Sequence, residues 1–260
     1  MKVIVSHDVD HLYWGEHFFD RFLFGSIYRA FKEVLSNRES LLNVASRFLD
    51  FRLNNIDELI LFDKQYGVKP TYFFGMDNAL SLSYDYKKTE LYINKVLESG
   101  GFVGLHGIDY NSKLHMSREK ERLQKMLPEE YCFGIRNHYL RQSEKTKQIQ
   151  FELGYLYDST DYNDAPPSRI GNFLEFPISV MDVTIEREAN YSLKEMKAIT
   201  LKLIETFDDM NKPYFVVNFH DVYYRDSYSR MKQWYEWLIE YLYLQNYTFT
   251  SFNEECVNNR

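Results

Sequence analysis

The strongest constraint in the sequence is a unit that occurs three times: an amphipathic helical segment, a glycine, and a short apolar or aromatic strand. Glycine adopts the left-handed conformation that commonly ends a helix, so each glycine marks a boundary between helix and strand. The three copies are 56–66, Gly67 and 71–74; 89–99, Gly100 and 102–105; and 144–153, Gly154 and 155–157. Further strands are predicted at 3–6, 133–135, 174–180, 214–219 and 247–251, and further helices from Ser192 onward and over 228–245.

Alternating strands and helices predict a parallel sheet, because parallel neighbours need a crossover connection, which a helix supplies. Seven or eight such units within 260 residues favour closure into a barrel. We therefore expect an α/β fold, a distorted (β/α)7-8 barrel that spans residues 1–260 as a single domain. In such barrels the functional side chains lie at the carboxyl ends of the strands.

Residues 12–55 interrupt this pattern between the first strand and the first regular unit. They predict a helical insertion that is rich in aromatic side chains: Trp14, Phe18, Phe19, Phe22, Phe24, Tyr28 and Phe31. The insertion could close over the site as a lid, or its helices could pack on the outside of the barrel. Periodicity does not decide between the two.

Composition excludes several classes of partner. A net charge of −7 and a pI near 5.6 argue against a nucleic-acid or anionic-membrane surface, which needs clustered Lys and Arg. The first residues pass from one lysine directly into a strand, without a secretory signal, and no apolar run approaches the ~20 residues of a membrane span. We therefore expect a cytoplasmic protein. Cys132 and Cys256 are too few for a disulfide framework and lack thiolate metal-site spacing.

Titratable side chains follow most of the predicted strands: Asp8, Asp10, His106, Arg136, His138, Asp158, Asp182, His220 and Asp221. The strand-end rule predicts that they converge at one mouth of the barrel. Asp8 and Asp10, two apart in extended chain, face the same side. Two such carboxylates favour a metal ion or a general-base role, although aspartates at strand ends can also merely cap the next element. Mixed Asp and His ligation suits zinc or a related divalent ion.

Seven short motifs stand in order along the chain: Asp8-Val9-Asp10, Thr71-Tyr72-Phe73-Phe74, Leu105-His106, Arg136-Asn137-His138-Tyr139, Tyr157-Asp158-Ser159-Thr160, Phe219-His220-Asp221 and the segment 247–252. Together they resemble the motifs of the polysaccharide deacetylases of carbohydrate esterase family 4, the NodB-homology type. The corresponding family motifs are the paired aspartates, the TFF strand, the histidine motif, Arg-x-Pro-Tyr, YDSS, Leu-His-Asp and the final F-V-T strand.

The resemblance implies a metal-dependent hydrolase that removes an N-acetyl group from an amino sugar. It implies that Asp8 is the general base, that Arg136 orients Asp8, and that His220 is the general acid. The backbone N–H of Tyr139 would help to form the oxyanion hole. For the partner of His220, Asp182 and Asp221 both remain open.

The histidine motif departs from the family pattern. The family has His-x-x-x-His, whereas Tyr110 stands four residues after His106. His138 occupies the place of the proline in the Arg-x-Pro-Tyr motif, where an imidazole could supply the missing nitrogen. We therefore predict Asp10, His106 and His138 as the metal ligands, with His11 and Asp109 as reserves.

Two other hypotheses remain. Tyr110 in place of a histidine is the main support for a catalytically degenerate carbohydrate-binding or scaffold protein of a glycan assembly pathway. Related barrels also hydrolyse other non-peptide C–N bonds, such as those of cyclic ureides. Asp8, Arg136 and His220 together favour the deacetylase, because a binding module needs no base, orienting partner and acid. The missing secretory signal favours acetylated precursors of a surface glycan as substrates over mature polymers.

Overall fold

The computed structural model describes residues 1–17, 21–36 and 38–258. Phe18 and Phe19 of the predicted insertion lie outside these residues. Within them, no helix is both long and apolar enough to cross a membrane.

The strands of the described chain belong to one sheet, whose hydrogen-bonded order is β6-β7-β5-β4-β3-β2-β1-β9-β8, with β10 paired to β1. Neighbouring strands are parallel except for β6 and β7. The strands are β1 (Lys2–Val9), β2 (Thr71–Phe74), β3 (Phe102–Gly107), β4 (Ile135–Asn137), β5 (Tyr157–Asp158), β6 (Ser168–Ile170), β7 (Phe173–Glu175), β8 (Val180–Met181), β9 (Tyr214–His220) and β10 (Thr248–Thr250).

One stretch of chain, 173–181, connects the two ends of this order. Its first part, β7, pairs with β5, and its last part, β8, pairs with β9. Between them, Ile178 forms a parallel bridge with Tyr162, which follows β5. The sheet therefore curls into a distorted barrel, which confirms the predicted fold class.

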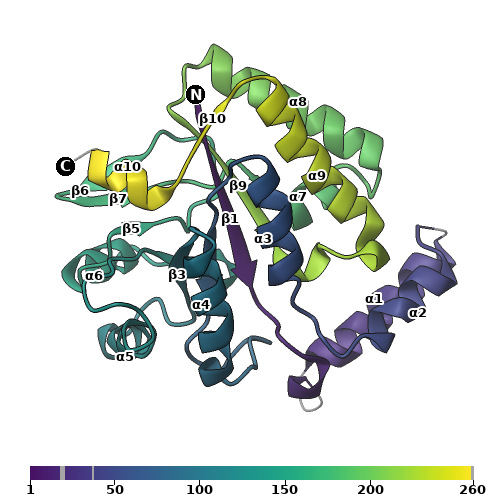
Figure 1. Ribbon diagram of the computed structural model, residues 1–260, viewed down its shortest axis with the longest axis horizontal. Coiled ribbons are helices and arrows are strands. Elements are labelled where there is room, and N and C mark those ends of the chain that lie inside the picture. The colour runs from purple at the N-terminus through teal and green to yellow at the C-terminus, as the bar shows by residue number, and fades with distance from the viewer. Residues whose placement is uncertain (18–20, 37, 259–260) are drawn as a thin grey trace.

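The helices surround the sheet, except for α1 and α2, which form an arm beyond the carboxyl end of β1 (Figure 1). This confirms the helical insertion predicted for residues 12–55. The helices are α1 (Arg21–Leu35), α2 (Leu41–Leu49), α3 (Ile56–Gln65), α4 (Glu90–Glu98), α5 (Lys113–Gln124), α6 (Thr146–Glu152), α7 (Asp182–Glu188), α8 (Leu193–Asp209), α9 (Ser229–Leu244) and α10 (Phe252–Asn258).

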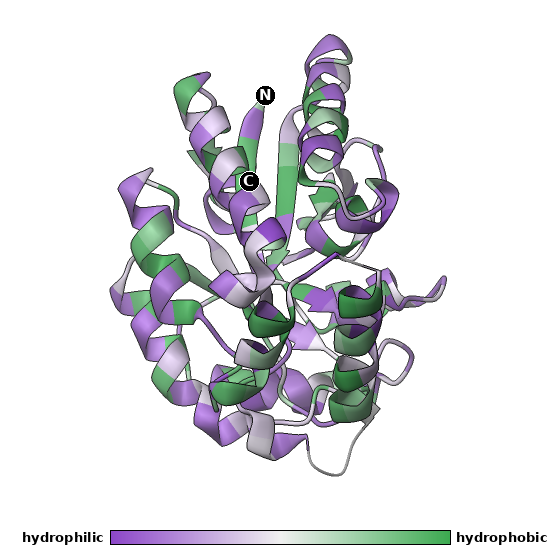
Figure 2. Cartoon of the chain, turned by 90° about the vertical axis from the view of Figure 1, so that its right-hand side faces the viewer, coloured by the Kyte–Doolittle hydropathy of each residue, from purple (hydrophilic) through white to green (hydrophobic). Residues whose placement is uncertain are grey.

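Helix ends follow local sequence closely. Gly67, Gly100 and Gly154 have φ values of 69°, 85° and 70°, as their positions after α3, α4 and α6 predict. Ser192 is the N-cap of α8, and its side chain accepts a hydrogen bond from the N–H of Glu195. The predictions omitted α5, α7, α10 and β6, and the predicted strand 174–180 is divided between β7 and β8. Most helices carry both hydrophobic and hydrophilic residues (Figure 2), because one face packs on the sheet.

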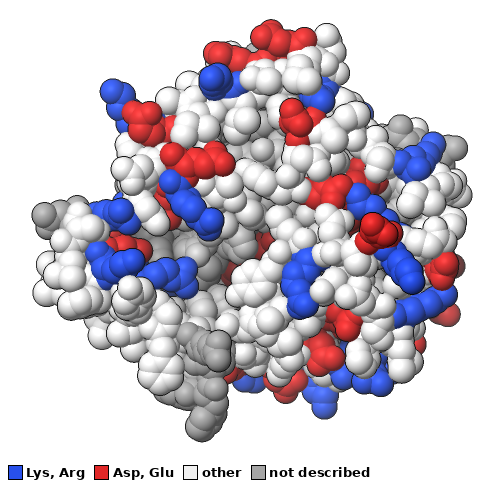
Figure 3. Space-filling model, turned by 180° about the vertical axis from the view of Figure 1, so that it is seen from behind, with Lys and Arg blue, Asp and Glu red and all other residues white. Residues whose placement is uncertain are grey.

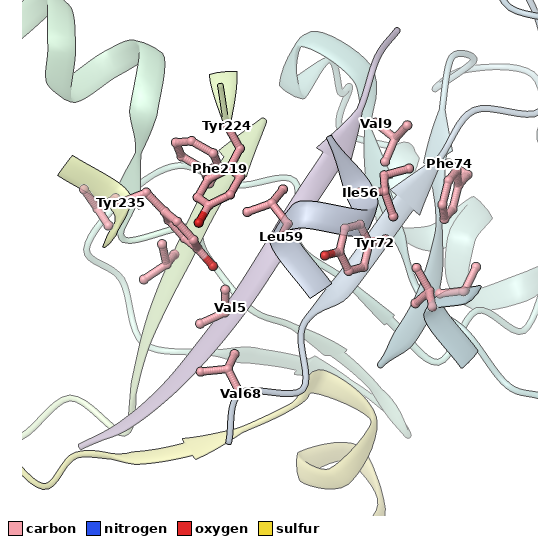
Figure 4. Close-up of a cluster of buried hydrophobic side chains, with 14 of the residues drawn as sticks. Val5, Val9, Ile56, Leu59, Val68, Tyr72, Phe74, Phe219, Tyr224 and Tyr235 are labelled. Carbon is pink, nitrogen blue, oxygen red and sulfur yellow. The ribbon is translucent and has the colours of Figure 1, made fainter. Parts of the chain in front are cut away.

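The outward side of the sheet carries the main core. Figure 4 shows Val5 and Tyr72 from the strands, Leu59 from α3 and Tyr235 from α9 in this layer. The inward side has a second apolar cluster, built from Ile4 in β1, Phe73 in β2, Tyr157 in β5, Phe176 after β7 and Phe252 in α10. The second layer fills the lower part of the barrel, so only its upper part remains for polar groups.

The contact between Gly134 and Tyr157 predicts an overpacking mutant. A Cβ atom at Gly134 would lie 2.3 Å from the Tyr157 ring, which is fully buried. We expect Gly134→Ala to lower the free energy of unfolding by roughly 1–3 kcal/mol in urea titrations. Gly25→Ala is the matched control, because a Cβ there has nothing within 4 Å. Equal unfolding free energies for wild type and Gly134→Ala would contradict the predicted packing.

Candidate metal centre and active site

Three potential metal ligands converge at the carboxyl ends of the strands: Asp10 after β1, His106 in β3 and His138 directly after β4. The Nε2 atom of His106 lies 3.1 Å from Asp10 Oδ1, and the Nδ1 atom of His138 lies 3.3 Å from the same oxygen. The two facing imidazole nitrogens are 3.0 Å apart.

Backbone carbonyls fix the tautomers of both histidines. His106 Nδ1 lies 3.0 Å from the carbonyl oxygen of Arg136, and His138 Nε2 lies 3.1 Å from that of Leu80. A carbonyl only accepts, so these ring nitrogens carry the protons, and the facing nitrogens present lone pairs. Among the described residues, Asp10 Oδ1 has no hydrogen-bond donor. Three acceptor atoms that face one another favour a cation between them.

The donor set fits a divalent ion such as zinc. A tetrahedral zinc ion with bonds of ~2.0–2.2 Å holds its ligand atoms ~3.3–3.6 Å apart, a few tenths of an ångström more than the spacing found here. Three protein ligands leave one position for water, as in catalytic zinc sites. Burial lowers the pKa of His138, but the Asp10 carboxylate outweighs this effect and the pKa is raised. Without a metal ion, a proton would therefore take the place of the cation.

Left-handed backbone flanks His138 on both sides. Tyr139 and Leu140, which follow it, have φ values of 55° and 53°. Leu80 and Ser81, which lie across from it, have φ values of 54° and 72°. Such conformations are costly for residues other than glycine and are concentrated at functional sites. Here they place the Leu80 carbonyl against His138 and direct the chain around the candidate centre.

Two hydrogen bonds hold the Asp8 carboxylate beside the candidate metal ligands. Arg136 Nη1 donates to Asp8 Oδ1 at 2.9 Å, and Asn218 Nδ2 donates to Asp8 Oδ2 at 2.8 Å. Burial raises the pKa of Asp8, but the Arg136 guanidinium, with smaller contributions from His106 and His220, lowers it to about 2. Asp8 is therefore ionised at neutral pH.

His220 faces Asp8 across the site. Its Nδ1 atom lies 2.8 Å from Asp182 Oδ1, and its backbone N–H donates to Asp182 Oδ2 at 2.7 Å. Its Nε2 atom points between Asp8 Oδ2, at 3.9 Å, and Asp10 Oδ2, at 3.8 Å. Burial lowers the pKa of His220, but Asp182 and the other two carboxylates raise it to about 10. Of the two carboxylates considered for this histidine, Asp182 is the partner.

Other predicted residues lie outside the donor set. Asp221 points to the outer side of the sheet, where the N–H of Asn55 donates to it. Asp158 accepts from the Thr160 hydroxyl. These two carboxylates therefore support the backbone near the site.

The reserve ligands and Tyr110 also lie outside the donor set. His11 is buried against Phe22, with ring centroids 3.7 Å apart. Asp109 accepts from the backbone N–H groups ahead of α5. Tyr110 lies under the Arg141 guanidinium, 4.4 Å from it.

Sequence reasoning missed Asn218, Ser6 and Ser159, which bind Arg136 or Asp8. The alternation of a strand could have identified two of them, since Ser6 precedes Asp8 by two residues and Asn218 precedes His220 by two. No sequence signal indicated the Leu80 carbonyl, because its role depends on loop geometry.

A pocket of about 480 Å³ opens over these groups. Asp8, Asp10 and His220 form part of its floor, and Phe22 and Arg29 from the helical arm form part of its wall. Its volume lies within the ~300–1,000 Å³ range of small-molecule sites.

Fold and site together define an α/β barrel with a candidate divalent metal centre at its mouth. No family model and no curated protein sequence matches the chain. Solved structures do match. A candidate polysaccharide deacetylase from Mycobacterium smegmatis is 15% identical, with a TM-score of 0.67, over 99% of this chain and 89% of its own.

A second structural match is wild-type BA3943 from Bacillus anthracis, described as a CE4 family pseudoenzyme. It is 11% identical, with a TM-score of 0.53, over 98% of this chain and 65% of its own. A mutant of BA3943 with restored enzymatic activity matches equally well, over 67% of its length. This chain therefore has the polysaccharide deacetylase fold, as its motif order predicts.

The donor geometry predicts that the purified protein binds zinc and that His138→Ala weakens binding. Loss of a ligand should weaken zinc binding by at least ~100-fold, because loss of a residue that only orients a ligand already weakens it by ~10- to 100-fold. Competition titration with a chelating dye measures this, with circular dichroism to verify folding. His115→Ala is the control, because His115 is exposed and paired with Asp109. Unchanged zinc affinity in His138→Ala would remove His138 from the ligand set.

Proposed function

We propose that this protein is a metal-dependent hydrolase that removes an N-acetyl group from an amino sugar. One observation carries the proposal: the Asp8–Arg136 pair, the His220–Asp182 pair and the donor set of Asp10, His106 and His138 face one pocket. Amide hydrolysis needs an activated water, stabilisation of the oxyanion and a proton for the leaving amine. The groups around this pocket can meet each need.

Asp8 is the group that accepts a proton from the attacking water. Arg136 and Asn218 hold its carboxylate in one orientation and keep it ionised. A divalent ion held by Asp10, His106 and His138 would lower the pKa of a bound water and polarise the acetyl carbonyl. Asp8 lies beside this centre, and its Oδ2 atom is 3.9 Å from the Nε2 atom of His220.

His220 is the group that donates a proton to the departing amine. Asp182 binds its Nδ1 atom and stabilises the imidazolium, so the Nε2 proton points into the pocket. The N–H of Tyr139, in the left-handed turn after His138, is the proposed donor to the oxyanion. Base and acid thus lie next to each other in the pocket floor, with 3.9 Å between Asp8 Oδ2 and His220 Nε2, so one substrate amide can be within reach of both.

The pocket supports an acetylated amino sugar as the substrate. Its wall includes the exposed ring of Tyr139 and the ring of Phe22 on the helical arm. Aromatic faces pack on the apolar faces of sugar rings. The arm would act as a lid over a short substrate, an acetylated precursor of a surface glycan.

One observation favours a second candidate function. The BA3943 matches include a pseudoenzyme, and Tyr110 leaves the family histidine motif incomplete here. A degenerate binding protein would bind sugar without releasing acetate. Acetate release from N-acetylated monosaccharides, sugar phosphates and chitin oligomers, measured on the zinc-loaded protein, tests the first proposal. Sugar binding without acetate release would favour the second, and release of a different acid or amine would favour another C–N bond.

Asp8→Asn is expected to reduce turnover by ~10²- to 10⁴-fold, because the amide keeps the size of the carboxylate but cannot accept the water proton. Zinc content and circular dichroism establish that the variant retains the metal ion and folds. Asp57→Asn is the control, because Asp57 pairs with Lys95 outside the pocket and its change should leave turnover unaltered. Turnover in Asp8→Asn equal to that of the wild type would exclude Asp8 as the base.

A further inference from the structure

A second cavity of about 330 Å³ adjoins the pocket over the metal centre. The two share a border made by Ser26, Arg29, Val183, Arg187, Tyr223 and Tyr228. The arm, through α1, forms one side of this border, and α7 and the chain after β9 form the other. A ligand bound at the metal centre can therefore extend into the second cavity without leaving the protein.

The second cavity is lined by more cations than carboxylates. Its charged residues are Arg29, Lys32, Glu33, Arg38, Glu39, Arg47, Glu186, Arg187 and Arg230. The carboxylates are already paired. Glu33 is bound by Arg47 at 2.6 Å, and Glu186 and Glu39 lie 2.8 Å and 3.7 Å from Arg230.

The other four cations of this cavity are Arg29, Lys32, Arg38 and Arg187. Within residues 1–17, 21–36 and 38–258, none of the four has a carboxylate within ion-pair distance. Two of them stand at the border between the cavities, Arg29 on α1 and Arg187 on α7, and both are exposed. Figure 3 shows Lys and Arg side chains along the hollow between the arm and the body of the molecule. Such a gathering is unusual in a chain whose net charge is −7.

We propose that this border binds the phosphate or diphosphate of a carrier attached to the sugar that occupies the metal centre. The assignment of the sugar rests on the proposed function, but the anion site does not. Arg29 and Arg187 at the border, with Lys32 and Arg38 farther into the second cavity, supply more positive charge than one sugar carboxylate needs, and this charge suits a diphosphate. Guanidinium groups bind phosphate oxygens through paired N–H donors, and Arg29 and Arg187 approach the same space from opposite sides.

Calorimetric titration of the full-length protein with inorganic pyrophosphate tests the site directly, with and without zinc. Arg187→Gln is expected to bind pyrophosphate roughly 10- to 100-fold more weakly, the usual effect of losing a charged hydrogen-bond donor. Arg29→Gln should act in the same direction. Lys113→Gln is the control, because Lys113 is paired with Glu152 away from both cavities. Binding that needs zinc and is unaltered in Arg187→Gln and Arg29→Gln would overturn the proposal.

The attached sugar is tested by comparing N-acetylglucosamine with N-acetylglucosamine 1-phosphate and with its uridine diphosphate ester. The proposal expects tighter binding of both phosphorylated sugars, with the advantage reduced in Arg187→Gln. Vesicles that contain a polyprenyl diphosphate distinguish a lipid carrier from a nucleotide. Equal binding of neutral and phosphorylated sugars would contradict the proposal. Arginine-dependent pyrophosphate binding without acetate release from any sugar would leave the anion site standing and reject the proposed deacetylation.

Discussion

The structure of the site depends on one buried cation, the guanidinium of Arg136. It is fully buried, and its nitrogens donate to Asp8, to the Ser6 hydroxyl, to the Asn218 side chain and to both the carbonyl and the hydroxyl of Ser159. These partners come from β1, β9 and the chain after β5, so a single side chain connects strands around the barrel. A buried charge is tolerated only when it is paired and its donors are satisfied. Loss of Arg136 would leave the Asp8 carboxylate without a cation inside the barrel.

Strand alternation divides the interior into an apolar base and a polar mouth. Along β1, Ile4 belongs to the lower layer, and Asp8, farther along the same face, reaches the site. The alternate residues face outward, where His7 is bound by Asp63 from α3. The Arg136 guanidinium stacks 4.4 Å from the Phe73 ring, at the boundary of the two layers. The apolar base excludes water from below and thereby strengthens the electrostatic contacts above it.

In the proposed metal centre, the third ligand comes from a different strand than the deacetylase motif would suggest. Tyr110 stands where that motif has its second histidine after β3, and the His138 nitrogen after β4 faces Asp10 and His106. The Leu80 carbonyl orients the His138 ring, because it accepts a hydrogen bond from the Nε2 atom on the side of the ring away from Asp10. Left-handed backbone at 80–81 and 139–140 brings this carbonyl and the His138 ring together.

The sequence alone determined the features that depend on near neighbours along the chain: the glycine-ended helices, the strands between them, and the placement of Asp10 and His106 at strand ends. Their periodicity also predicted a barrel. Only the tertiary structure chose Asp182 over Asp221 as the partner of His220, because these aspartates face opposite sides of the sheet. It also decided how 173–181 joins the two ends of the sheet, and which cations beside the pocket are neutralised. Those outcomes depend on distances between residues far apart in sequence, which local patterns do not encode.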